Sequence, residues 1–174
     1  MKICIDPGHG GFDPGACGYG LKESDVNLKY ALLLRQLLTQ KGHQVIMTRE
    51  TDKTMSLGER TRFANNNKAD LFISCHCNAA ANPQAHGVET LVYSDKSVSA
   101  YYLARAIVES LEKDCSLKSR GVKFRRKLYV LKNTKMPAIL IELGFISNEQ
   151  EAKRLAHLDF LKLAAYTIAD EIRG

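Results

Sequence analysis

Two histidines and a glutamate lie where apolar runs of the sequence end. His9 follows the N-terminal run inside a glycine-rich turn, and His76 follows the run of residues 70–74. A third run, residues 138–141, ends in Glu142. Glycines let the backbone turn sharply beside His9 and leave its ring accessible to a metal or a substrate. Because parallel strands end at a common edge of a sheet, we expect the three side chains to share one site for metal binding or acid–base chemistry.

A carboxylate near the two histidines would complete a common type of zinc site. A catalytic zinc typically takes three protein ligands, often two histidines and a glutamate, and leaves a fourth position for water. Glu23 ends the glycine-rich turn just before a predicted helix, which Ser24 or Asp25 could cap so that Glu23 is held in position. There are two alternatives. The imidazoles could serve only as hydrogen-bonding groups, and Glu23 could be only a carboxylate at the start of a helix, where the helix dipole stabilises a negative charge.

Other polar residues have roles that their positions suggest. A carboxylate at the end of an apolar strand is costly to bury without a partner, so Glu142 indicates a metal, a base or another functional reason. We expect His43 to be structural and His86 and His157 to lie on the surface, with His86 also able to line a cleft. Two arginines are expected to pair with carboxylates: Arg49 and Arg60.

The chain has five cysteines, an odd number without a C-x-x-C pair, so a disulfide framework is not expected. Cys75 and Cys77 flank His76. Because alternate residues of an extended chain point to the same face, both thiols should point away from the imidazole of His76. We expect them to pack in the core, and a thiolate metal ligand or nucleophile is the alternative.

The apolar pattern alternates between strand and helix throughout the chain and predicts an α/β fold. The run of residues 138–142 is almost wholly apolar, so we expect a central strand that is covered on both faces. Strands separated by helices of this length predict a mostly parallel sheet. The other predicted strands are residues 2–6, 44–48, 70–74, 88–93 and 128–131. The predicted helices are residues 25–41, 56–67 with a capping box of Ser56 and Glu59, 97–113, a helix capped by Ser147 and Gln150, and 159–173 capped by Asp159.

Composition and charge limit the class of protein. The 174 residues suffice for one domain, 1–174, and 45% apolar with 25% charged residues argue against disorder and against an integral membrane segment. Asp6 and the following glycines interrupt the first apolar run, so this run is too short for a signal peptide. We therefore expect a protein that is made in the cytoplasm and released by lysis, or one whose leader is missing. The net charge of +6 favours an anionic partner, and residues 118–127 read as a basic loop that either is merely solvated or contacts that partner.

Several motifs resemble the zinc-dependent N-acetylmuramoyl-L-alanine amidases. They recur in the family's order over residues 1–148, and the last is the most specific. In that family the residue before the second histidine is typically aliphatic and the residue after it small, whereas here both are cysteines, which could compete for zinc or make the site sensitive to oxidation. The motifs are DPGHGGFDPGA at 6–16, Glu23 followed by VNL, TR at 48–49, SCHCNA at 74–79 and MPAILIELGFISN at 136–148.

The resemblance implies that His9, Glu23 and His76 bind Zn²⁺ and that Glu142 is the catalytic acid/base. It also implies a twisted, mostly parallel sheet flanked by helices on both faces. The implied reaction is hydrolysis of the amide between the lactyl group of N-acetylmuramic acid and L-alanine in peptidoglycan. We therefore expect a monomeric autolysin or phage endolysin that acts at the bacterial cell wall, with anionic wall polymers as a further partner.

Three other classes of function compete with this expectation. The first is a non-catalytic module that binds peptidoglycan or regulates wall enzymes on the same fold. The second is a basic nucleic-acid binder, which is not expected because the sequence has neither a recognised binding motif nor an aromatic stacking platform. The third is a cysteine peptidase that uses Cys75 or Cys77.

Overall fold

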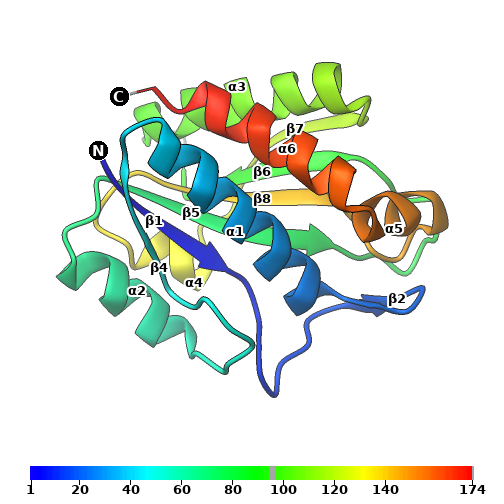
Figure 1. Cartoon of the computed structure of the whole chain (residues 1–174), viewed down its shortest axis with the longest axis horizontal. Coiled ribbons are helices and arrows are strands. Elements are labelled where there is room, and N and C mark those ends of the chain that lie inside the picture. Colours follow the sequence, from blue (N-terminus) through cyan, green and yellow to red (C-terminus); the bar gives the residue numbers. More distant parts are fainter. Residues whose placement is uncertain (95–96, 174) are drawn as a thin grey trace.

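The computed structural model describes residues 1–94 and 97–173. Its centre is a six-stranded sheet in which four strands run parallel, while the two strands at one side run antiparallel to them and parallel to each other (Figure 1). The order across the sheet is β4 (Gln44–Met47), β1 (Lys2–Pro7), β5 (Leu71–Asn78), β8 (Ala138–Phe145), β6 (Val88–Val92) and β7 (Ser119–Phe124).

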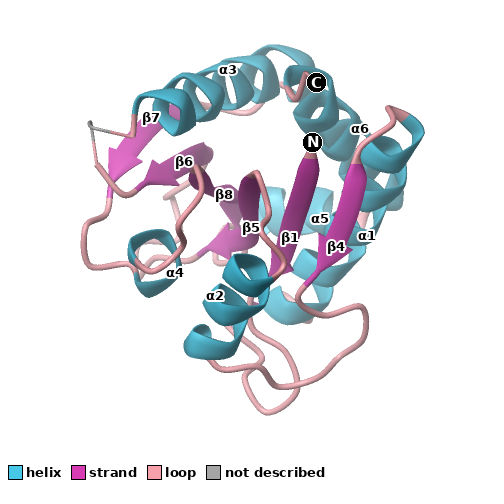
Figure 2. Cartoon of the chain, turned by 90° about the vertical axis from the view of Figure 1, so that its left-hand side faces the viewer, coloured by secondary structure: helices cyan, strands magenta, loops and turns pink. Residues whose placement is uncertain are grey.

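Helices cover both faces of the sheet, as the sequence predicted. One face carries α1 (Glu23–Gln40), α3 (Val98–Cys115) and α6 (Leu158–Glu171), and the other carries α2 (Leu57–Asn66) and α4 (Tyr129–Lys132) (Figure 2). The short helix α5 (Glu149–Ala156) follows β8 at the end of the sheet toward which the parallel strands run (Figure 1). The two chain termini both lie at the opposite end (Figure 1).

Strand β8 shows why the sheet is buried on both faces. Ile139 and Ile141 belong to the larger core, beneath α1, α3 and α6, whereas Leu140 packs in a smaller core with Ala64 of α2 and Val130 of α4. A strand with apolar residues on both faces is stable only when both are covered. The prediction of a central strand is confirmed, because β8 lies between β5 and β6.

Two strands are longer than predicted, and this corrects the position of two site residues. His76 and Glu142 lie within β5 and β8 rather than just past their ends. The two residues are register partners, and pairing continues to Asn78 and Phe145 through an irregularity. Each predicted strand ends where its apolar run meets a polar residue. The strands continue past that point because backbone groups form the hydrogen bonds between strands, whatever the polarity of the side chains.

The two predictions for the segment before β8 are wrong. Most of the basic stretch, expected as a loop, is strand β7 (Ser119–Phe124), and residues 128–131, expected as a strand, fall largely in α4 (Tyr129–Lys132). β7 is an edge strand with no fully buried residue, so it lacks the apolar pattern of a core strand. A four-residue apolar run is too short to distinguish a strand from a turn of helix.

The structure confirms one predicted helix start and corrects others. Ser56 and Glu59 form the predicted capping box of α2. Asn148, rather than Ser147, caps α5 and accepts hydrogen bonds from two backbone N–H groups. Within the described residues no side chain caps α6, which begins at Leu158 with Asp159 already in its first turn.

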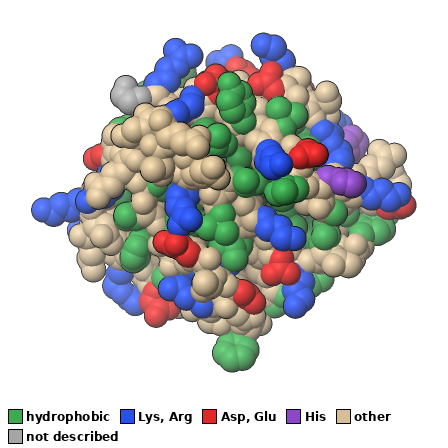
Figure 3. Space-filling model, viewed as in Figure 1, with side chains coloured by type: hydrophobic (Ala, Val, Ile, Leu, Met, Phe, Trp, Pro, Cys, Tyr) green, Lys and Arg blue, Asp and Glu red, His purple; other side chains and the backbone are tan. Residues whose placement is uncertain are grey.

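The surface mixes charges of both signs. On the face shown in Figure 3, lysines and arginines alternate with acidic side chains and small hydrophobic patches. In the described part of the chain, no helix combines the length and the apolarity that crossing a membrane requires.

Candidate metal centre

His9 lies in a sharp turn directly after β1. Its own φ is +61°, a left-handed conformation that is uncommon for a residue other than glycine. Two glycines leave room for the rings. A Cβ at Gly8 would lie 2.2 Å from the ring of His76, and one at Gly15 would lie 2.7 Å from both the ring of His9 and a carboxylate oxygen of Glu23. The glycines of this turn therefore allow the backbone to approach the site closely.

The structure brings the three predicted metal ligands together. His9 Nε2 lies 3.3 Å from Glu23 Oε1, and His76 Nδ1 lies 2.9 Å from the same oxygen. One donor atom from each of these residues lies within 4.8 Å of the other two. The imidazole rings approach edge to face, with their centroids 5.0 Å apart. Two imidazole nitrogens and one carboxylate oxygen converging on a point fit the donor set of a catalytic zinc.

Glu23 is held by backbone groups rather than by a helix cap. It is the first residue of α1, so neither Ser24 nor Asp25 caps the helix as predicted. Its Oε2 accepts a hydrogen bond from the N–H of Ala16 at 2.9 Å, and its Oε1 accepts one from the N–H of Cys77 at 3.2 Å. The carboxylate is thus fixed between the glycine-rich turn and β5.

Asp13 orients His9, a role that the sequence analysis missed. Its Oδ2 lies 2.7 Å from Nδ1 of His9, which leaves Nε2 of the same ring facing Glu23. Carboxylates commonly hold the second nitrogen of a metal-binding histidine in this way. One feature of the sequence could have indicated this role: Asp13 lies in the same glycine-rich turn as His9.

The ion pairs set the charges of the cluster. The hydrogen bond with Glu23 raises the pKa of His9 from its ordinary 6.5 to about 9, against the opposing effect of burial. Burial disfavours ionisation of Glu23, but hydrogen bonds from His76 and His9 outweigh it and hold its pKa well below the usual range. Glu23 is therefore ionised at neutral pH, as a metal ligand must be.

Glu142 lies next to the cluster in a different environment. It is the register partner of His76 across β5 and β8. Its Oε2 is buried and, among the described residues, accepts no hydrogen bond. Burial raises the pKa of Glu142 from 4.5 to about 7. A carboxyl group that titrates near neutral pH can both accept and donate a proton.

A cleft of about 420 Å³ opens onto these residues. A larger hollow of about 640 Å³ lies along α1 beside Leu158, but among the described residues that line it there is neither a histidine nor a carboxylate. The two imidazoles of the candidate metal centre and Glu142 line the smaller cleft. The residues lining that cleft come from the turn after β1, the start of α2, α4 and the ends of β5 and β8, and include His9, Asp13, Met55, Arg60, His76, Tyr129 and Glu142.

Two buried arginines support the turn that carries His9. Arg60 pairs with Asp6 at 2.9 Å, as predicted for an arginine and a carboxylate, and also donates to the carbonyl of His9 at 2.7 Å. Arg49 departs from the prediction, because it donates to backbone carbonyls, including those of Gly8 at 2.9 Å and Ser24 at 2.8 Å. The arginines thus connect β1, α1 and α2 beneath the candidate site.

The remaining candidates lie away from the cleft. Cys75 and Cys77 are buried in the core on the face opposite His76, as predicted. Burial raises the pKa of the Cys75 thiol to about 12 and that of Cys77 well above its ordinary value, which argues against a thiolate nucleophile. His43 is buried, and His86 is exposed in a separate hollow beside α5 rather than in the cleft.

Fold and site together define an α/β domain with a candidate mononuclear metal centre at the sheet edge where its parallel strands end. Residues 3–174 match the family model Amidase_3, described as N-acetylmuramoyl-L-alanine amidase. The chain belongs to this family.

Relatives and solved structures agree with this assignment. The chain is 37% identical over 167 residues to the sporulation-specific N-acetylmuramoyl-L-alanine amidase of Bacillus subtilis, covering 95% of this chain and 64% of that protein. It is 39% identical over 177 residues to the endolysin of Bacillus phage SPP1, covering 98% of this chain and 64% of that protein. The crystal structure of an N-acetylmuramoyl-L-alanine amidase from Clostridium difficile 630 superposes with a TM-score of 0.94 at 33% identity, covering 98% of this chain and 93% of that one. The chain thus spans about two thirds of the length of these two relatives and nearly all of the solved domain.

Proposed function

We propose that residues 1–174 form the catalytic domain of a zinc-dependent N-acetylmuramoyl-L-alanine amidase. The domain would hydrolyse the amide between the lactyl group of N-acetylmuramic acid and L-alanine in peptidoglycan. Family membership supports the reaction. The observation that carries the proposal is the convergence of His9, Glu23 and His76 within 4.8 Å beside the unpaired, buried Oε2 of Glu142.

The proposed ligands of Zn²⁺ are His9, Glu23 and His76. When bound, zinc supplies Lewis acidity to the scissile carbonyl and lowers the pKa of a bound water toward neutrality. Asp13 keeps His9 oriented, and the backbone N–H groups of Ala16 and Cys77 keep Glu23 oriented. The buried arginines beneath the turn keep the backbone of His9 in its left-handed conformation.

Glu142 is the proposed acid/base. Its Oε2 accepts the proton of the attacking water and then donates that proton to the nitrogen of the leaving L-alanine, because an amine anion is too basic to depart unaided. A pKa of about 7 suits both steps.

The test is the release of stem peptides with a free N-terminal L-alanine from purified walls. Release should stop when the protein is treated with a chelator and return when zinc is added. Release unaffected by chelation would exclude the metal. No release under any metal condition would contradict the amidase and favour the second candidate, a peptidoglycan-binding module on the same fold.

We also propose that the protein acts at the bacterial cell wall, as an autolysin or an endolysin, and that anionic wall polymers bind near the end of β7. Arg125 and Lys127 are exposed there, beside the exposed Phe124. The ring of Phe124 stacks on Tyr101, with centroids 6.0 Å apart. Basic side chains next to an aromatic surface favour a polyanion.

A further inference from the structure

A row of polar residues crosses the sheet beyond Glu142. Glu142 is the register partner of His76 on one side and of Glu89, in β6, on the other. Residues in register on neighbouring strands direct their side chains to the same face. Glu89 therefore extends the line of site residues one strand further across the sheet.

Glu89 is fully engaged in hydrogen bonds. Its side chain is only 8% exposed. Its Oε1 accepts a hydrogen bond from Nδ2 of Asn78 at 3.1 Å, and its Oε2 accepts one from Nε of Arg120 at 2.9 Å. Both oxygens are occupied, so Glu89 is suited to orient a neighbour rather than to react.

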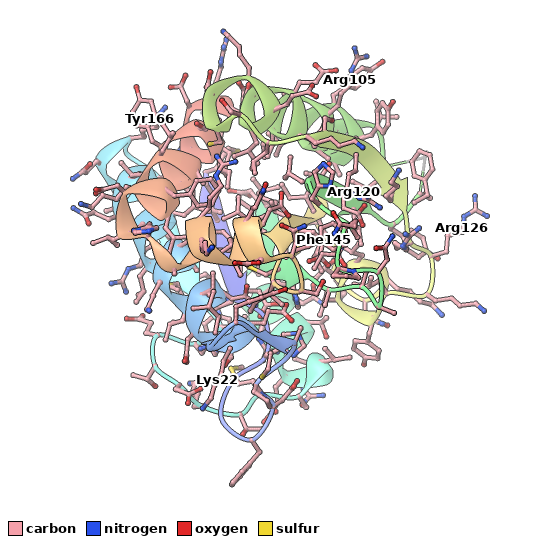
Figure 4. The ribbon with its side chains drawn as sticks, turned by 90° about the vertical axis from the view of Figure 1, so that its right-hand side faces the viewer. Lys22, Arg105, Arg120, Arg126, Phe145 and Tyr166 are labelled. Atoms are coloured by element: carbon pink, nitrogen blue, oxygen red, sulfur yellow. The ribbon has the colours of Figure 1, made fainter. Side chains whose placement is uncertain are left out.

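Arg120 is held in place yet remains open to solvent. Its guanidinium carbon lies 4.9 Å from the centroid of the Phe145 ring, and its side chain is 36% exposed. Nη1 makes one long contact, 3.4 Å, to the carbonyl of His86. Among the described residues no group accepts a hydrogen bond from Nη2. Arg120 and Phe145 lie together at the end of the molecule toward which the parallel strands run (Figure 4). Lys22, the residue before the proposed ligand Glu23, lies at the same end (Figure 4).

We propose that Arg120 binds a carboxylate of the peptide part of the substrate while the scissile amide lies at Glu142. This assignment rests on the proposed amidase function and names a specificity residue for it. A guanidinium matches a carboxylate with two parallel hydrogen bonds, and one fixed by Glu89 and Phe145 loses little entropy on binding. Stem peptides carry free carboxyl groups that can be amidated, so the interaction would distinguish the two forms.

The experiment compares the zinc-loaded protein with its Arg120→Gln variant on two soluble muramoyl peptides that differ only in one carboxyl group, free or amidated. For the free carboxylate we expect kcat/KM of the variant to fall by about 10- to 100-fold, mainly through KM. For the amidated peptide we expect a change within about twofold, because no charged partner is lost. Equal losses on both peptides would overturn the assignment and leave Arg120 as the structural counter-ion of Glu89.

Two further variants keep the test decisive. Arg105→Gln is the matched control, because Arg105 also donates from Nε to a carboxylate, that of Glu109 at 2.7 Å, but lies on α3 away from the strand ends (Figure 4). It should leave both substrates unchanged. If Arg120→Gln unfolds because Glu89 is left unpaired, the double variant Arg120→Met with Glu89→Gln removes both charges and should show the same selective loss.

Failure of the two proposals can be told apart. If the wild-type protein hydrolyses neither peptide under any metal condition, the amidase proposal fails, and equilibrium titration of the same two peptides then tests Arg120 alone. Tighter binding of the free carboxylate by the wild type than by Arg120→Gln supports the assignment. Equal binding, or none, overturns it.

Discussion

Three glutamates occupy one small region and differ only in their surroundings. Glu23 lies between two imidazoles, which keep it ionised, and Glu89 has both oxygens occupied by Arg120 and Asn78. Glu142 alone has a buried oxygen without a partner among the described residues, and a pKa raised to about 7. The same side chain is thus a candidate ligand, an orienting group or a proton carrier according to what it contacts.

Glu142→Gln should separate catalysis from metal binding. The change keeps the shape of the side chain but removes the proton acceptor, so we expect peptide release to fall by about 10²- to 10⁴-fold. Zinc content should not change, because Glu142 is not among the three proposed ligands. The measurement is release of stem peptides together with metal analysis of the purified variant. Activity within tenfold of the wild type would contradict the assigned role.

Zinc binding should release protons. The pKa of His9 is raised to about 9, so at pH 7 its ring is a cation with a proton on each nitrogen, and one of these protons must leave before a metal can bind. A raised pKa favours the protonated, metal-free form, so apparent zinc affinity should increase as the pH rises toward 9. Titration calorimetry in two buffers of different ionisation enthalpy measures the protons released.

Asp13→Asn provides the comparison for this prediction. Asp13 contributes to the raised pKa of His9, so the variant should release fewer protons at the same pH. Zinc binding without any proton release in the wild type would contradict the prediction.

At the scale of elements, the turn after β1 is the part most constrained by the site. Gly15 and Gly20 both have left-handed φ angles, +67° and +78°. A Cβ at Gly15 would lie 2.7 Å from His9 and Glu23, whereas at Gly20 it would meet no described atom within 4 Å. A substitution at Gly20 therefore tests backbone strain alone, whereas one at Gly15 tests backbone strain together with displacement of the site residues.

Gly15→Ala should weaken zinc binding, and Gly20→Ala should not. Gly20→Ala should lose about 1 kcal/mol of stability, because alanine is strained in the left-handed region. Gly15→Ala should lose at least as much, because its Cβ would also clash with His9 and Glu23. Only Gly15→Ala displaces the ligands, so its zinc affinity should fall by about tenfold or more. Competition with a chromophoric chelator measures the affinity and urea unfolding measures the stability. Equal zinc affinities for the two variants would contradict the proposed geometry.

Arg60 should be the most costly residue of α2 to replace. It pairs with Asp6, which is 1% exposed, so Arg60→Met leaves a buried carboxylate without its counter-ion. We expect a loss of about 3–5 kcal/mol in the free energy of unfolding. Arg62 is exposed on the same helix, and Arg62→Met should change the stability by less than about 0.5 kcal/mol. Urea unfolding measures the free energy of unfolding of both variants. Similar losses in the two would show that the buried pair of Arg60 and Asp6 does not stabilise the fold.

The sequence predicted the buried strands of the sheet and missed the exposed edge strand β7. Strands β1, β5 and β8 have apolar patterns because both of their faces are covered, whereas β7 lies at the sheet edge and reads as a basic loop. The proposed ligands were identifiable because His9, Glu23 and His76 stand in recognisable motifs. Asp13 lies only four residues from His9 in the same turn, so a local signal for its role existed. Arg120 contacts Glu89 across two strands, and local sequence patterns do not contain that information.

At the scale of the whole molecule, strand order explains how residues far apart in sequence form one site. β1, β5 and β8 are neighbours in the middle of the sheet, and they deliver His9, His76 and Glu142 respectively. Side chains at the ends of adjacent parallel strands meet without long loops.

Wall binding should depend on salt, and soluble turnover should not. The net charge is +6, and charges exposed near the end of β7 are screened as the ionic strength rises. Replacing Arg125 and Lys127 by glutamate should weaken sedimentation with purified walls but leave hydrolysis of a small muramoyl peptide unchanged. Binding to walls that is insensitive to salt would contradict the proposed polyanion contact.

Both chain termini lie at the end of the sheet opposite to the one toward which the parallel strands run (Figure 1). A tether attached at either terminus would therefore leave the strand ends that carry His9, His76 and Glu142 facing outward. The domain could be immobilised on a bead or fused to an affinity module in either order without obstructing access by an insoluble substrate. Because both termini lie at the same end, attachment through either one presents the strand ends in the same direction.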